Sequence, residues 1–418
     1  MAATALRILC GLFCLALCTV ATLTSSGAAK RSEGPQKRFV VYLTGQHNVV
    51  PELSLVSRVT HVALAFMRSE VFNVPQQSDW PLFITIADVR AKFAKGTKIQ
   101  VAIGGWGNTD GFSQAAQTDE SRRLFAGNIK AMIDATGADG VDIDWEYPGG
   151  NGEDYKQIPN SEKTWETDAY PELLAEIRAA IGPSKLLTAA VPGLERDMLA
   201  FTENNLPKIY KSVDFLNVMT YDLVNRRDTI TDHHSGLHGS IKAIHPYLTS
   251  EEAGHTQNLN IGLGFYVRWY KTAAGHRCDK VPAIHCQTEL MEDPITGADL
   301  GKSGAFSWHD EVPAELADSF ARALKFGEDD MSGGLLRGHF YMDKRERIFW
   351  SWDTAHTIVK KLEDIYDFFA AESHGERQGV GGVFAWGLGE DAPRFEHLEA
   401  VNKLLDEWNA RISEHQEL

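Results

Sequence analysis

The stretch "DGVDIDWEYPGG", residues 139–150, places four acidic side chains among Val, Ile and Trp. Successive side chains of a strand point to opposite faces, so Asp142, Asp144 and Glu146 share one face and apolar side chains share the other. Asp139 is out of phase and stands at the start of the strand. A buried carboxyl row is costly, because burial and mutual repulsion both disfavour ionised carboxylates. The pattern therefore indicates chemistry rather than packing.

Seven further apolar runs accompany this segment along the chain. Most are near-continuous rather than alternating, which is typical of strands covered on both faces. The eight predicted strands span residues 39–43, 59–66, 98–106, 140–145, 186–193, 213–221, 259–267 and 379–388. Helix-like stretches such as 121–137 and 170–182, each ending in Gly, lie between them. This alternation predicts an α/β fold, the (β/α)8 TIM barrel, and no phosphate-loop signature supports an open doubly wound sheet instead.

The ends of the chain and one long gap predict the domain organisation. Residues 1–29 have the basic start, apolar core and small-residue end of a secretory signal peptide. Two dibasic pairs indicate a short pro-segment over 30–38. The barrel is expected over 39–418, with 271–345 as a small insertion between strands seven and eight. Within and just beyond this insertion we expect a helix near residues 312–327 and a hairpin over 339–352.

The signal predicts a secreted, extracellular protein, and the cysteines agree with export. Cys278 and Cys286 are the only cysteines outside the signal, which predicts one disulfide between them. The C-terminal "HQEL" loosely resembles an ER-retrieval tail, but we favour a chance match. The net charge of −16 argues against nucleic acid or an anionic membrane as a partner.

Two metal interpretations of the motifs are weak. Asp142, Asp144, Glu146 and Glu153 match positions of a calcium loop, but Tyr147 stands where that loop requires Gly. The histidines of "DHHSGLHG", residues 232–239, lack helical spacing and a third acidic ligand, so we expect exposed loop histidines rather than a zinc site. We therefore expect neither a metal nor a cofactor.

Several motifs together resemble one enzyme family. "DGVDIDWEYP" resembles the Asp-x-x-Asp-x-Asp-x-Glu signature of glycoside hydrolase family 18, the chitinases. "VAIGGW", "VMTYD", "GFYVR" and "VFAWGLGED" resemble the motifs of that family on strands three, six, seven and eight. One departure is Ala102, where the family usually has a Ser that hydrogen-bonds the first buried Asp. Tyr42 or water is the expected replacement partner of Asp142.

The resemblance implies a retaining, substrate-assisted hydrolysis, which differs from the two-carboxylate scheme. Glu146 would protonate the scissile oxygen, and the 2-acetamido oxygen of the substrate would attack C1 to give an oxazolinium intermediate. Asp144 would orient the acetamido N–H, and Asp142 would share a proton with Asp144. Tyr221 would donate to the acetamido oxygen. Asp139 would brace the strand.

The resemblance also implies where the sugar binds. Trp386 would lie under the −1 sugar, and Trp106 would contact the +1 side. The further expected sugar contacts are Tyr42, Met219, Asp222, Tyr266 and Arg268. The expected protein is thus a monomeric, cofactor-independent chitinase (EC 3.2.1.14 type) acting on chitin or chitooligosaccharides. An endo-β-N-acetylglucosaminidase on N-glycans and a chitin-binding lectin are the alternatives.

Overall fold

The computed structural model describes residues 36–416, except 249–255, 276–277, 279–283 and 373–379. The predicted signal peptide and most of the predicted pro-segment lie outside the described residues. The last two residues of the "HQEL" tail also lie outside them.

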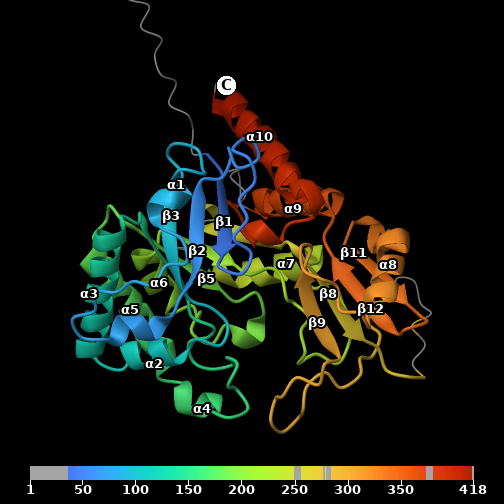
Figure 1. The fold of residues 1–418 in the computed structure, drawn as a ribbon, viewed down its shortest axis with the longest axis horizontal. Helices are drawn as coiled ribbons and strands as arrows, with labels where there is room; N and C mark the ends of the chain where they lie inside the picture. Colours follow the sequence, from blue (N-terminus) through green and yellow to red (C-terminus); the bar gives the residue numbers. More distant parts are fainter. Residues whose placement is uncertain (1–35, 249–255, 276–277, 279–283, 373–379, 417–418) are drawn as a thin grey trace, which may run out of the picture. The chain divides into compact units, whose positions relative to one another are not determined.

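Eight parallel strands close into a barrel (Figure 1). In barrel order the strands are β1 (Arg38–Thr44), β13 (Gly382–Trp386), β7 (Leu259–Gly264), β6 (Phe215–Val218), β5 (Leu186–Val191), β4 (Gly140–Asp144), β3 (Lys98–Gly104) and β2 (His61–Met67). Each of the eight predicted strands supplies one barrel strand, so the predicted (β/α)8 fold is confirmed. The observed β6 is shorter than its prediction, because the chain leaves the sheet after Val218.

Helices pack around the outside of this barrel, and α3 and α5 lie against each other in Figure 1. The helices of the barrel layer are α1 (Ile86–Arg90), α2 (Asp110–Ala116), α3 (Asp119–Thr136), α4 (Asn160–Lys163), α5 (Glu166–Ile181), α6 (Leu206–Ser212), α7 (Leu237–Ile244), α9 (Ala355–Glu372) and α10 (Glu396–Gln416). The side chains of Thr118 and Ser121 cap the start of α3 reciprocally. Gly137 ends α3 at φ 76°, a left-handed conformation that glycine adopts without strain.

A second, five-stranded sheet lies between β7 and β13 in the chain. Its strands in order are β10 (Glu328–Asp329), β11 (His339–Asp343), β12 (Ile348–Trp352), β8 (Tyr266–Lys271) and β9 (Ser303–Ser307), and α8 (Ala317–Phe326) packs on it. The predicted hairpin over 339–352 is confirmed as the antiparallel pair β11–β12. The predicted strand 259–267 is two strands, since the chain passes from the barrel to this sheet at Phe265.

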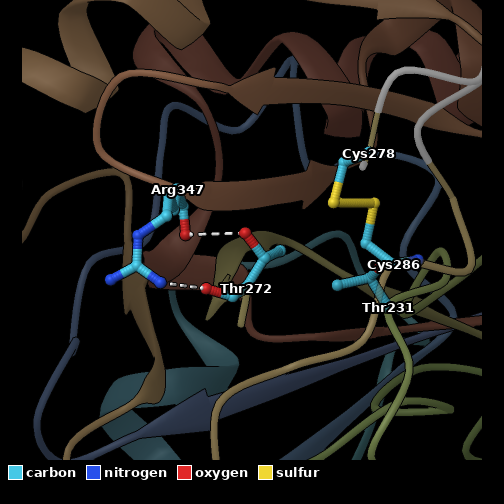
Figure 2. Close-up of a disulfide and its surroundings, with 5 residues drawn as sticks. All are labelled: Thr231, Thr272, Cys278, Cys286 and Arg347. Atoms are coloured by element: carbon cyan, nitrogen blue, oxygen red, sulfur yellow. Dashed lines mark hydrogen bonds between the residues drawn. A yellow bond between two sulfur atoms is a disulfide. The ribbon is translucent and has the colours of Figure 1, made fainter. Parts of the chain in front are cut away.

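The predicted disulfide between Cys278 and Cys286 is confirmed, with the two Cα atoms 5.5 Å apart (Figure 2). The backbone N–H of Cys286 donates to the Thr231 hydroxyl at 3.0 Å. Nearby, Arg347 Nη1 donates to the Thr272 carbonyl at 2.9 Å. The first contact ties the disulfide loop to the β6–α7 segment, and the second joins the turn between β11 and β12 to the residue that follows β8. No helix within the described ranges is long and apolar enough to cross a membrane.

The expectation of exposed loop histidines in residues 232–239 is wrong for two of the three. His233 and His234 are 6% and 0% exposed, whereas His238 is exposed. His233 Nε2 lies 3.0 Å from Asp330 Oδ2, and its ring packs on aromatic side chains of β11 and β12. The second sheet covers this loop, which depends on residues about a hundred positions away.

Candidate active site

Asp142 lies in the interior of the barrel and is fully buried. Its Oδ2 accepts a 2.6 Å hydrogen bond from the Tyr42 phenol, and its Oδ1 accepts from Thr188 Oγ1 and, at 3.4 Å, from Asn217 Nδ2. Burial raises the pKa of Asp142, and these hydrogen bonds oppose the rise. Ala102 pairs with Asp142 in the register of β3 with β4 but has no hydroxyl to offer. Tyr42 therefore takes the place expected for it, together with Thr188.

Asp144 and Glu146 continue the carboxyl row towards the carboxyl end of β4. Burial, followed by the charges of Glu146 and Asp142, raises the pKa of Asp144 well above its usual value. Asp144 Oδ1 has no hydrogen-bond partner among the described residues. Burial raises the pKa of Glu146 to about 7; a hydrogen bond with Tyr147 opposes the rise, and the charges of Asp222 and Asp197 add to it. The row thus retains a proton near neutral pH, as general acid catalysis requires.

Tyr221 and Asp222 follow β6, which is two strands from β4 around the barrel. Burial and the nearby Asp144 and Glu146 charges raise the pKa of Tyr221, so its phenol remains a donor. Asp222 accepts from the Tyr266 phenol at 2.6 Å and pairs with Arg268 Nη1 at 3.0 Å. Although burial opposes ionisation, these partners lower the pKa of Asp222 to about 2. Asp222 is therefore a fixed negative charge close to the acid Glu146.

Two tryptophans provide aromatic surfaces at different places in the site. Trp386, at the end of β13, stacks on Phe66 with ring centroids 5.4 Å apart and planes tilted by 20°. Trp106, after β3, is 47% exposed, and its described ring neighbours are Tyr147 and the Arg227 guanidinium at 5.5 Å. An exposed indole held in place is suited to stack against the apolar face of a sugar.

These side chains surround one cleft of about 910 Å³. The predicted site residues that line it are Trp106, Asp144, Glu146, Met219, Tyr221, Asp222, Tyr266, Arg268 and Trp386. Tyr42 and Asp142 do not line the cleft, because both are buried within the barrel. The structure thus places Tyr42 as a partner of the carboxyl row rather than as a direct sugar contact.

Asp139 lies apart from the cleft, one residue before β4. Its Oδ2 accepts from the backbone N–H of Ile99 at 2.8 Å and from Arg90 Nη2 at 2.9 Å. These contacts connect the start of β4 to β3 and to α1, a position compatible with the strand-bracing role predicted for Asp139.

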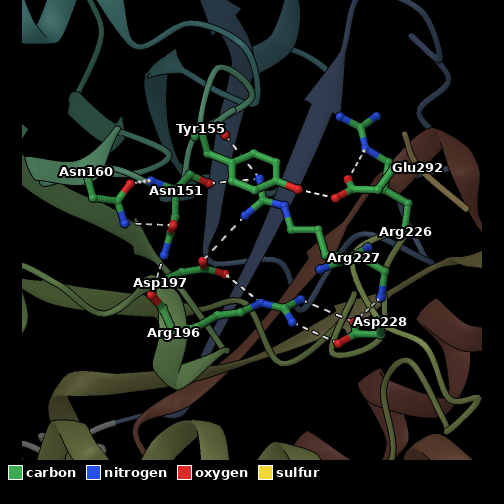
Figure 3. Close-up of polar contacts among 11 residues, drawn as sticks. Asn151, Tyr155, Asn160, Arg196, Asp197, Arg226, Arg227, Asp228 and Glu292 are labelled. Carbon is green, nitrogen blue, oxygen red and sulfur yellow. Dashed lines mark hydrogen bonds and ion pairs between the residues drawn. The ribbon is translucent and has the colours of Figure 1, made fainter. Parts of the chain in front are cut away.

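A polar network that no sequence pattern predicted lies on the wall beside Trp106 and is drawn in Figure 3. Arg227 lies 3.9 Å from the centre of the Tyr155 ring and donates to the carbonyls of Asn151 and Gly152. Its Nη1 is 3.8 Å from Asp197 Oδ1. Both Arg227 and Asp197 line the cleft. They come from loops without a periodic pattern, so only the folded chain brings them together.

No group of three or more His, Cys, Asp or Glu side chains with metal-binding geometry occurs in the described part of the chain. The arrangement offers a buried proton donor, a second carboxyl beside it, a phenol donor and aromatic surfaces. Together these groups suit acid-catalysed cleavage of a glycosidic bond.

Comparison with known proteins gives the family. The family described as Glycosyl hydrolases family 18 matches residues 38–391, so the chain belongs to that family, as the motifs indicated. Chitotriosidase-1 of Mus musculus is 31% identical over 186 residues, which are 43% of this chain and 38% of that protein. Chitinase B of Serratia marcescens is 24% identical over 357 residues, 73% of this chain and 66% of that protein. The chain thus spans well under two thirds of the mouse relative.

A solved structure agrees on the fold. The chitinase of Rhizomucor miehei superposes with a TM-score of 0.67 at 20% identity, covering 88% of this chain and 100% of that chain.

Proposed function

We propose that this protein is a chitinase that hydrolyses β-1,4 bonds between N-acetylglucosamine units with retention of configuration. The observation that carries the proposal is the carboxyl row of β4: Glu146, with a pKa near 7, lines the same cleft as Asp144 and Tyr221. Family membership and the chitinases among the relatives support the choice of chitin as substrate.

In the proposed mechanism Glu146 gives its proton to the scissile glycosidic oxygen, and the C1–O bond breaks. The acetamido oxygen of the −1 sugar attacks C1 and forms a cyclic oxazolinium ion. Asp144 accepts a hydrogen bond from the acetamido N–H and balances the positive charge that develops. The Glu146 carboxylate then takes a proton from a water that attacks C1, which restores the acid and opens the ring.

The remaining groups prepare this chemistry. The Tyr221 phenol donates to the acetamido oxygen, and the buried Asp142 shares a proton with Asp144. The unpaired Oδ1 of Asp144 supports its role, since a buried acceptor without a partner is costly until substrate supplies the donor. Trp386 supports the −1 sugar from below, and Trp106 contacts the +1 side.

The experiment that tests the proposal compares products from two substrates side by side. Chitohexaose should be cut to shorter chitooligosaccharides, while a high-mannose glycoprotein should keep its glycans. Release of glycans without cleavage of chitohexaose would favour an endo-β-N-acetylglucosaminidase. Tight binding of chitohexaose without cleavage would favour a lectin, although the presence of Glu146 speaks for an enzyme.

We also propose that the protein is secreted, on the basis of the signal-like residues 1–29 and the disulfide between Cys278 and Cys286. N-terminal sequencing of the protein recovered from culture medium tests this. A mature chain that begins near residue 30 or 39 is expected, and retention of an uncleaved N-terminus inside the cell would contradict secretion.

A further inference from the structure

The order of the strands divides the cleft into two sides. On one side, the strands β3 to β6 are continuous in the barrel, and three residues that follow these strands line the cleft: Trp106 after β3, Asp197 after β5 and Arg227 after β6. Trp386 and His47 follow β13 and β1, which are neighbours in another part. We call the second group of loops, together with the adjoining residues 303–310, the Trp386 side. A sugar chain that crosses the carboxyl row therefore meets different chemistry on each side.

Glu390 on the Trp386 side has no role in the proposed mechanism. It is 8% exposed and lines the cleft. Its carboxyl has no hydrogen-bond partner within the described ranges; the imidazole of His47 lies beside it, with Nδ1 3.7 Å from Glu390 Oε1. His47 Nε2 lies 2.8 Å from Asp310 Oδ1, and the buried His47 Nδ1 also lacks a hydrogen-bond partner. Two carboxyls and one imidazole thus meet at the wall of the cleft.

This cluster has acceptors but is short of donors. Burial opposes ionisation of Asp310, but His47 and the backbone of Ser307 hold the pKa of Asp310 below its usual value. Asp310 is therefore ionised and accepts the proton of His47 Nε2, so that this donor is not available to Glu390. Burial, together with the Asp310 and Asp222 charges, raises the pKa of Glu390 to about 7, while His47 opposes the rise. A cation with several N–H donors would satisfy these groups.

We propose that Glu390, with His47 and Asp310, forms a subsite for the free ammonium group of a glucosamine unit, so that partly deacetylated chitin is the preferred substrate. The ammonium presents three N–H donors and a charge to the carboxyls. An N-acetyl group would present one donor, no charge and an apolar methyl. The inference rests on the proposed function: the sugar over Trp386 keeps its acetamido group for the reaction, and its neighbour on the non-reducing side carries the amine.

The test uses the full chain and a chitosan with about half of its units acetylated. Products of a brief digestion are sequenced by mass spectrometry, and the unit that precedes the new reducing end is scored. In wild type the ratio of glucosamine to N-acetylglucosamine at this unit should be about five to one, compared with about one to one in the starting chitosan, the factor that ~1 kcal/mol gives. Glu390→Gln should reduce the enrichment to near one.

Glu311→Gln is the matched control, because it removes the same charge one residue from Asp310. Glu311 is exposed and does not line the cleft. Glu311→Gln should keep the wild-type enrichment. Absence of enrichment in wild type, enrichment at another unit, or unchanged enrichment in Glu390→Gln would each overturn the inference. If Glu390→Gln does not fold, as judged by circular dichroism, Asp310→Asn takes its place with the same expectation.

Cleavage of fully acetylated chitotetraose distinguishes failure of the ammonium subsite from failure of the proposed chitinase function. If wild type cleaves it but shows no glucosamine enrichment on chitosan, only the ammonium subsite is refuted. If wild type cleaves neither substrate, the proposed chitinase function itself fails.

Discussion

The phenol of Tyr42 on β1 donates a 2.6 Å hydrogen bond to Asp142 Oδ2 on β4, three strands away around the barrel. The same phenol oxygen accepts from Asn217 Nδ2 at 3.1 Å. Ala102, which pairs with Asp142 on the adjacent strand, leaves room for this arrangement. The innermost carboxyl of the row is therefore held both across the barrel interior, by Tyr42, and from the neighbouring strand β5, by Thr188.

Replacing Tyr42 by Phe should weaken both folding and catalysis. The buried Asp142 carboxyl loses a donor, so its pKa should rise and the free energy of unfolding should fall by about 1–3 kcal/mol. Urea unfolding measures the stability, and the pH dependence of kcat on chitotetraose reports the change in the carboxyl row.

Tyr210→Phe is the matched control for that experiment. The Tyr210 phenol donates to the Tyr247 backbone carbonyl at 2.8 Å and does not line the cleft. It should lower the stability without moving the pH profile. Identical pH profiles for wild type, Tyr42→Phe and Tyr210→Phe would mean that Tyr42 has only a packing role.

Glu146→Gln should abolish hydrolysis and leave binding of chitotetraose largely intact. The amide keeps the shape of the side chain but has no acidic proton to give to the glycosidic oxygen. Calorimetric titration with chitotetraose measures the binding, and product analysis measures turnover. Substantial residual turnover would show that another group is the acid.

Asp144→Asn and Tyr221→Phe should each lower kcat by roughly 10²-fold or more, the scale of losing one transition-state electrostatic partner. Neither change removes the acid Glu146. Steady-state kinetics on chitotetraose measures the effect, and near wild-type kcat in both variants would mean that the acetamido group binds elsewhere.

The alkaline limb of the pH profile should report Glu146. Its protonated form is the active one, so activity should fall as pH rises through about 7. Burial raises the pKa of Asp197 to about 6. Once ionised, Asp197 contributes a negative charge that helps to raise the pKa of Glu146. Asp197→Asn removes this charge and should move the alkaline limb to lower pH.

Glu195→Gln is the control for Asp197→Asn, since Glu195 is exposed and lies in the same short helical turn, η2 (Glu195–Asp197). Glu195→Gln removes a charge that solvent screens, so the alkaline limb of the pH profile should not move. A shift of the same size in both variants would point to net charge rather than to the neighbourhood of Glu146.

The sequence predicted the parts of the fold that depend on local patterns. Apolar runs identified all eight barrel strands, and glycines marked the ends of α3 and α5. The boundary at Phe265 was missed, because the residues around it remain apolar while the chain changes sheets. The burial of His233 and His234 was also missed, since it depends on distant strands of the second sheet that cover their loop.

In the site, too, some residues could be predicted from local patterns, whereas others depend on the folded chain. The carboxyl row follows from the two-residue period of a strand and could be predicted. Thr188 lies within the apolar run of β5 and gave no signal of its contact with Asp142. Asp197 and Glu390 end short helical turns that follow β5 and β13, and the order of the strands, which no local pattern encodes, brings these turns to the same cleft.

In the proposed mechanism the substrate supplies the nucleophile through its acetamido group. Glu146 supplies the proton, while Asp142 and Asp144 lie with it on one segment and are not placed across the sugar from it. NMR of fresh digests of partly acetylated chitosan tests this directly, because it reports both the acetylation and the anomer of each new reducing end. We expect N-acetylated reducing ends that appear first as the β anomer. Deacetylated reducing ends, or an initial α anomer, would contradict it.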